Sequence, residues 1–207
     1  MKKLILALAC MLTMGAAIAQ ENNDKKFGAE LQFGNMFYTN YSAISVFSGD
    51  AEPTLGQSYN ANFFYYPSKN FAWTLSCFVD GANTSNLALN EMYGTTGFTF
   101  GNRYIASISD RSELYVGIGV GMAFANNRFS YMDKDYTINR IGARFNWGIG
   151  YRYFVNPNAY IGVSVNYSGT SYFSNYKLPV NMLSNQSVNP KSGVQGLNFQ
   201  IGVGVKF

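Results

Sequence analysis

The chain has 207 residues, of which 47% are hydrophobic, 17% aromatic and only 13% charged, with a formal net charge of +4. Because average soluble domains carry about 25% charged residues, this chain has too few charges for an ordinary water-facing surface. Its many Tyr, Phe and Gly residues argue against an all-helical protein. The absence of histidine removes the side chain that most often transfers protons near neutral pH, and with it much of enzyme chemistry.

The first 19 residues have the pattern of a secretory signal peptide. Two lysines follow Met1, and an apolar stretch then runs from Leu4 to Ala19. The cleavage signature consists of Ala17, Ala19 and Gln20. We expect cleavage after Ala19, which leaves residues 20–207 as the mature chain. The alternatives are an uncleaved anchor, for which 16 apolar residues are short, and lipidation at Cys10.

Signal cleavage also changes the charge balance. It removes two of the 15 basic residues, so that 13 basic residues face 11 acidic ones and the formal charge falls to +2. The remaining Lys and Arg residues form no basic run, and we therefore expect no nucleic-acid partner.

Beyond the signal, large apolar residues alternate with small or polar ones, which is the period of a β-strand. The alternation predicts eight strands, in chain order 27–38, 58–66, 71–80, 93–104, 113–123, 140–153, 159–168 and 194–207. The last segment is the clearest, since Leu197, Ile201 and Val203 share one face while glycine, Asn and Gln occupy the other. A helix would mix these two classes on every face.

The connections between the predicted strands alternate in length. They are short after the second, fourth and sixth strands, and long at 39–57, 81–92, 124–139 and 169–193. Short turns at one end and long polar loops at the other are typical of an up-and-down transmembrane β-barrel. The prediction is therefore an all-β, eight-stranded antiparallel barrel at residues 20–207, with no domain boundary.

The two faces of the strands decide which solvent the barrel meets. The apolar face carries aromatic residues near strand ends, such as Trp73, Tyr104 and Tyr151, as expected for a lipid-facing band. The other face is rich in glycine and suits a narrow interior. We expect an outer-membrane barrel whose first and last strands pair, because backbone groups in lipid must be hydrogen-bonded. A soluble lipocalin-like barrel, with its apolar face inward, and a β-sandwich are the alternatives.

These features resemble the small outer-membrane β-barrel proteins of Gram-negative bacteria, the porin family, which includes OmpA-like membrane domains and Ail-like proteins. The resemblance covers the mature chain and includes a terminal strand that ends in Phe. It implies a location in the cell outer membrane, contact with lipid and lipopolysaccharide, and recognition by the barrel-assembly machinery. The residues that would carry this assembly signal are Phe199, Ile201, Val203, Val205 and Phe207.

Several charged residues fall on the predicted inward face. The proposed interior cluster consists of Glu113, Arg103, Arg152, Arg144, Glu30 and Lys206, and Asp80 and Arg140 share this face. Buried charges must be paired. Since the strand positions of Arg103 and Arg152 lie at the same end as Glu113, we predict that Glu113 sits between these two arginines. The cluster is either a gate for ions or a structural group of salt bridges.

An eight-stranded barrel is just wide enough for its own side chains to fill, so we expect a plugged lumen. The leading hypothesis is a non-enzymatic, monomeric protein with a structural role or a surface-interaction role through its long loops. Aromatic residues of the first and fourth loops would take part, namely Phe37, Tyr38, Tyr41, Phe47, Tyr167, Tyr172, Phe173 and Tyr176. The alternative is a narrow channel for ions or small solutes. The many small glycines on the inward face are compatible with this alternative.

Catalytic and metal-binding interpretations find little support in the sequence. Asp133 and Asp135 form an Asp-x-Asp pair in the third loop, but Lys134 lies between them and favours a solvated segment. Cys77 lies on the apolar face and is expected to be a small filler. We expect no cofactor.

Overall fold

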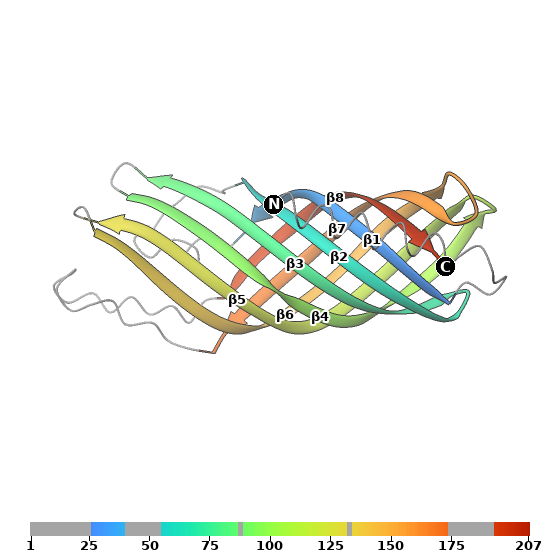
Figure 1. Ribbon diagram of the computed structural model, residues 1–207, viewed down its shortest axis with the longest axis horizontal. Coiled ribbons are helices and arrows are strands. Elements are labelled where there is room, and N and C mark those ends of the chain that lie inside the picture. Colours follow the sequence, from blue (N-terminus) through green and yellow to red (C-terminus); the bar gives the residue numbers. More distant parts are fainter. Residues whose placement is uncertain (1–25, 40–54, 87–88, 132–133, 174–192) are drawn as a thin grey trace.

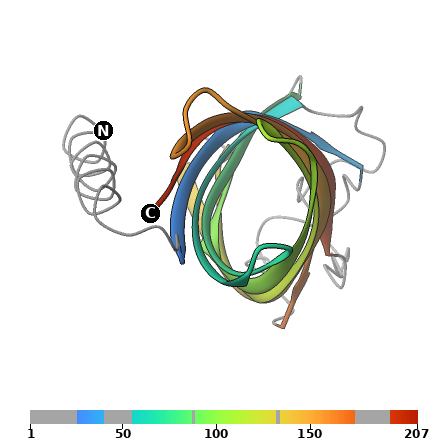
Figure 2. The same cartoon turned by 90° about the vertical axis from the view of Figure 1, so that its right-hand side faces the viewer.

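The computed structural model describes residues 26–39, 55–86, 89–131, 134–173 and 193–207, which form a closed antiparallel barrel. Its strands are β1 (Phe27–Tyr38), β2 (Leu55–Ser68), β3 (Phe71–Asn86), β4 (Leu89–Ser109), β5 (Ser112–Tyr131), β6 (Lys134–Phe154), β7 (Ala159–Tyr172) and β8 (Val194–Lys206). Each strand pairs with its chain neighbours, and β1 pairs with β8 (Figures 1 and 2). The predicted eight-stranded up-and-down barrel is confirmed.

The first and last strands close the ring along their whole shared length. Their register runs from Gly28 opposite Lys206 to Tyr38 opposite Gly196. At the end of this seam, Phe27 and Phe207 exchange two backbone hydrogen bonds of 2.8 Å. The backbone groups of both strands are thereby paired, as a barrel surrounded by lipid requires.

The apolar register faces outward. Val116, Ile149, Leu197 and Ile201 are 49%, 48%, 36% and 56% exposed. Polar and charged side chains instead fill the lumen, where Arg152 is fully buried. This orientation rules out the lipocalin-like alternative, in which the apolar side chains would point at one another inside the barrel, and ring closure rules out the sandwich.

Aromatic side chains gather on the outer face near the short-turn end. Trp73 on β3 stacks against Phe100 on β4, with ring centroids 5.5 Å apart, and Phe71 contacts both Trp73 and Tyr104 edge-on. Such rings are suited to the boundary between hydrocarbon and water. Cys77 is exposed on this same outer face.

Two of the four predicted long loops are strands instead. The pairing of β3 with β4 continues to Asn86 opposite Leu89, and that of β5 with β6 to Tyr131 opposite Lys134. The predicted loops 81–92 and 124–139 are therefore wrong. The apolar alternation stops there because the outward positions carry polar groups such as Asn126 and Asn139, whose amides are hydrogen-bonded at 2.7 Å. A strand that is surrounded by water needs no apolar outer face. Apolar alternation therefore does not predict these parts of the strands.

The lengthened hairpins give the barrel walls of unequal height. Strands β4, β5 and β6 have 21, 20 and 21 residues, whereas β1, β7 and β8 have 12, 14 and 13. In Figure 1 the β3–β4 and β5–β6 hairpins reach farther left than the other strands. The wall of β3–β6 therefore projects beyond the rest at the end opposite the short turns.

The predicted signal segment, with Ala17, Ala19 and Gln20, lies outside the described residues. Most of the first and fourth loops, including Tyr41, Phe47 and Tyr176, lies outside them as well. Within the described ranges, no helix has the length and apolar character needed to cross a membrane.

Candidate functional site

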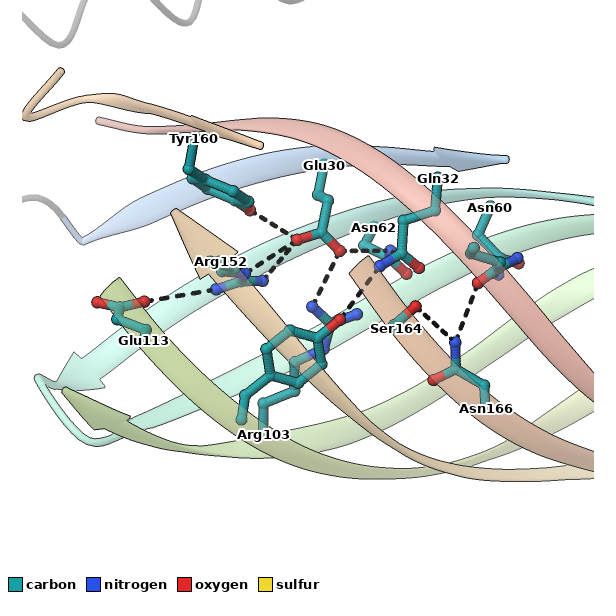
Figure 3. A network of polar contacts seen from close by, with 12 residues as sticks. Glu30, Gln32, Asn60, Asn62, Arg103, Glu113, Arg152, Tyr160, Ser164 and Asn166 are labelled. Carbon is teal, nitrogen blue, oxygen red and sulfur yellow. Dashed lines mark hydrogen bonds and ion pairs between the residues drawn. The ribbon is translucent and has the colours of Figure 1, made fainter. Parts of the chain in front are cut away.

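The lumen near the short turns is organised around one carboxylate, Glu30 of β1, which is 1% exposed (Figure 3). Its Oε1 accepts hydrogen bonds from Arg103 at 3.0 Å and from Asn62 at 3.2 Å. Its Oε2 accepts from Arg152 Nε at 3.0 Å and from the Tyr160 hydroxyl at 2.9 Å. Five strands thus meet at one side chain, and both oxygens of the buried charge are satisfied.

Glu30, and not Glu113, lies between the two arginines. Arg152 Nη2 is 2.8 Å from Glu30 and its Nη1 is 4.0 Å from Glu113, although Arg152 and Glu113 are opposite each other on β6 and β5. Glu113 pairs with Lys206 of β8 at 2.6 Å instead. The prediction that Glu113 lies between the two arginines is therefore wrong for Arg103, and for Arg152 it holds only as the 4.0 Å contact. Glu113 lies nearer the mouth, where its side chain is 12% exposed, so the arginines extend toward the deeper carboxylate.

Aromatic rings complete this end of the lumen. The Arg103 guanidinium lies 4.6 Å from the centroid of Phe64 and 4.3 Å from that of Tyr115, and Arg152 contacts the same two rings. These contacts matter because Arg103, Arg152 and Lys206 outnumber the two carboxylates of the cluster. Ring faces attract cations, most strongly where water is excluded, and they compensate for the missing negative charge.

The middle of the lumen holds a second ion pair. Arg144 of β6 lies 2.7 Å from Asp80 of β3, and Ser58 donates a hydrogen bond of 2.6 Å to the same carboxylate. Around this pair, the amides of Asn60 and Asn166 each donate to Gln200 at 3.0 Å. Arg144 is thus separate from the Glu30 network, although the sequence analysis grouped them.

The end of the lumen nearest the long hairpins is filled mainly by apolar and tyrosine side chains. Its buried cluster consists of Met36, Tyr38, Ala82, Tyr93, Ala125 and Val194. The hydroxyls of Tyr93 and Tyr172 lie 2.6 Å apart, and Tyr38 packs edge-on against Tyr93. Tyr38 and Tyr172, assigned above to the loops, therefore belong to the interior.

The inward glycines make room for these side chains. A methyl group on Gly150 would overlap the ring of Tyr115, and one on Gly204 would overlap the ring of Tyr160. On Gly97 it would come within 2.8 Å of Phe78. The inward glycines were the basis of the channel alternative. In the structure, the space beside them is occupied by aromatic rings from neighbouring strands. A small cavity of about 40 Å³ remains in the middle of the lumen, lined by polar side chains such as Asn60, Thr99 and Asn146.

Sequence reasoning missed the contribution of β2 to this site. Asn62, Phe64 and Tyr66 all point inward from that strand, and Tyr66 accepts a 3.4 Å hydrogen bond from Arg152. The alternation of Asn60 and Asn62 with outward aromatic residues could have revealed this face.

The residues of the expected assembly signal lie on the outer face of β8. Phe199, Ile201 and Val203 are 49%, 56% and 46% exposed, while Val205 and Phe207 are half-buried. Asp135 is exposed on β6, and Asp133 lies outside the described residues.

A closed barrel with an apolar exterior and a polar interior is the architecture of a small outer-membrane β-barrel protein. The model of the family "outer membrane protein beta-barrel domain" matches residues 6–207. The chain belongs to this family and is a protein of the outer membrane. No curated protein sequence matches it.

Solved structures show the same fold at low sequence identity. The attachment invasion locus protein Ail of Yersinia pestis is 13% identical, with 89% of this chain and 99% of that chain covered and a TM-score of 0.52. Neisserial surface protein A is 14% identical over 87% and 97%, with a TM-score of 0.53. A major outer membrane protein of Thermus thermophilus is 14% identical over 88% and 98%, with a TM-score of 0.52.

Proposed function

We propose that this protein is a non-enzymatic, plugged barrel that displays a projecting β-sheet for contact with a partner outside the cell. The absence of histidine from all 207 residues supports a non-enzymatic role. The side chains inside the lumen support a plug, because ion pairs lie near the short turns and in the middle, and packed aromatic rings lie at the hairpin end. The long hairpins replace two of the loops to which the sequence analysis assigned this role.

The observation that carries the proposal is the outer edge of β6, which no other described strand pairs beyond Gly142. Its pairing with β7 ends at Gly142 opposite Tyr172, whereas its pairing with β5 continues to Lys134. The carbonyl of Ile141 accepts from the Phe173 N–H at 2.9 Å and so points toward β7. Because backbone groups alternate in direction along a strand, those of Thr137 and Asn139 point the same way, past the last paired β7 residue. An open edge of this kind can accept an extended segment of another protein.

The edge is tested with linear dodecapeptides displayed on phage and selected against the purified barrel in lipid vesicles. Thr137→Pro removes the edge N–H, and we expect it to abolish binding of the selected peptides. Thr137→Ala keeps that N–H and should retain binding. Equal binding to both variants, or failure to select any peptide, contradicts edge pairing.

The plug is tested by conductance in planar bilayers. A lumen closed by the Glu30 and Asp80 ion pairs should give no steady unitary currents at neutral pH. Steady currents in the unmodified protein would favour the channel alternative.

We further propose that the terminal strand is read by the barrel-assembly machinery. Its outward residues lie at the seam, where β8 meets β1. Phe207→Ser should lower the amount of barrel in the outer membrane severalfold while leaving refolding in detergent unchanged. A matched loss of both would assign Phe207 to stability alone.

We propose that the protein is a monomer and that its outer face contacts lipid and lipopolysaccharide. Arg128 is exposed on β5 beyond the apolar band, where it can meet lipopolysaccharide phosphates, and its Nε donates to Asn126 at 3.2 Å. The closed ring offers no unpaired strand inside the bilayer, which favours a monomer.

A further inference from the structure

The mouth at the short-turn end opens into a bowl of about 1000 Å³. Three cationic residues line it from three separate segments: Lys26 precedes β1, Lys69 lies between β2 and β3, and Arg111 lies between β4 and β5. All three side chains are exposed. In outer-membrane barrels the short turns face the periplasm. This bowl therefore lies at the opposite end of the barrel from the projecting β3–β6 sheet.

The rim has an excess of positive charge. Within the described part of the chain, Lys26, Lys69 and Arg111 form no ion pair, and the only acidic residue beside them on the bowl's rim is Asp110. Among the described side chains of the rim, three cations against one carboxylate leave a formal charge of +2.

The floor of the bowl does not cancel this charge. Lys206 and Glu113 form a pair at 2.6 Å, and the ammonium group lies 5.0 Å from the ring centroid of Tyr66 and 4.8 Å from that of Phe154. Beneath the pair, two buried guanidiniums share the single carboxylate of Glu30. The described part of the short-turn end therefore attracts anions, because positive charge exceeds negative charge both on the rim and around Glu30.

The arrangement of the rim cations selects the form of the anion. The three side chains belong to separate segments of the chain and are exposed, so they do not converge on one small ion such as phosphate. An extended chain with several carboxylates can meet all three while its backbone lies over Pro67, Pro157 and the ring of Phe154. Lipid headgroups surround the outer wall of the barrel, whereas the bowl opens along the barrel axis. We propose that the bowl binds an acidic peptide segment presented from the periplasmic side.

The test uses a fluorescein-labelled decaglutamate peptide and the purified full barrel in a zwitterionic detergent, with binding followed by fluorescence anisotropy. Each exposed ion pair contributes about threefold to affinity. We therefore expect Lys26→Gln/Lys69→Gln/Arg111→Gln to weaken binding by about tenfold or more. Raising the ionic strength from about 20 mM to about 200 mM should also weaken binding strongly, because exposed charges are screened.

The matched control compares two single charge removals at opposite ends of the barrel. Lys69→Gln should weaken binding by about threefold, and Arg128→Gln, which lowers the net charge equally, should leave it unchanged. Equal effects of the two variants, no binding to the unmodified barrel, or salt-independent binding would overturn the proposal. Displacement of the peptide by phosphatidylglycerol would assign the bowl to lipid and also overturn it, whereas retention supports it.

Discussion

The two ends of the lumen are closed by different chemistry. At the short-turn end, one carboxylate holds two guanidiniums, a tyrosine and an amide, and Arg152 and Glu30 are 0% and 1% exposed. At the long-hairpin end, an apolar cluster and tyrosine rings that meet edge-on surround a buried cation, Arg140, whose guanidinium lies 4.2 Å from the centroid of the Tyr172 ring. Both ends belong to the same barrel. At the short-turn end the stabilising contacts converge on one residue, whereas at the long-hairpin end they are spread over several.

The difference concerns what happens when one side chain is lost. A buried charge that loses its only counter-charge remains in a medium that solvates it poorly, so the cost is concentrated in one residue. An apolar cluster loses only the contacts of the removed atoms. The short-turn end should therefore depend most on Glu30, whereas the long-hairpin end should lose little stability when one tyrosine hydroxyl is removed.

The largest expected effect is that of Glu30→Gln. The variant keeps the shape of the side chain but leaves Arg103 and Arg152 without the carboxylate, and we expect a loss of about 3–5 kcal/mol in the free energy of unfolding. The measurement is urea unfolding in lipid vesicles, followed by the fluorescence of Trp73 and Trp147.

The matched control is Glu113→Gln, which removes a partly hydrated carboxylate at the mouth. It should cost about 1 kcal/mol, because water can still reach the amide and Lys206. Equal losses for the two variants would contradict the central place of Glu30.

A second, smaller effect tests whether inward glycines hold the rings of the short-turn end. Gly150→Ala would push its methyl group into the ring of Tyr115, which packs against Arg103 and Arg152. We expect a loss of about 1–3 kcal/mol from overpacking, measured in the same unfolding assay. Gly169→Ala is the control, since its methyl group would meet only Gln195 Cγ at 3.8 Å. A neutral Gly150→Ala variant would mean that the ring can move aside.

The alternation of residue types identified both faces of the barrel because bilayer and lumen impose opposite demands on neighbouring positions. Leu197 and Asn198 are adjacent in sequence but 36% and 2% exposed. The same alternation put Glu30, Arg103 and Arg152 on one face. It failed above the bilayer, where water meets the outer face of β5 and β6 and the outward positions, such as Asn126 and Asn139, become polar.

The pairing within the lumen could not be read from the sequence. Glu113 and Arg152 are neighbours across two strands, and local register favoured their contact. The outcome depends on depth, because Glu30 on the opposite wall is inaccessible to water and must be paired. The position of a side chain along the barrel axis, and the partners it can contact on the opposite wall, depend on how all eight strands are staggered. The sequence of a single strand does not specify this stagger.

The smallest expected effect is at the long-hairpin end, where Tyr93→Phe removes one hydroxyl from the 2.6 Å contact with Tyr172 and keeps the ring in place. A neutral hydrogen bond contributes about 0.5–1.5 kcal/mol, and we expect a loss within this range in the urea assay. Tyr172→Phe should cost a similar amount, and the double variant should cost little more than either, since both remove the same bond. A Tyr93→Phe loss as large as that of Glu30→Gln would show that this end also depends on a buried polar centre, and the contrast between the two ends would disappear.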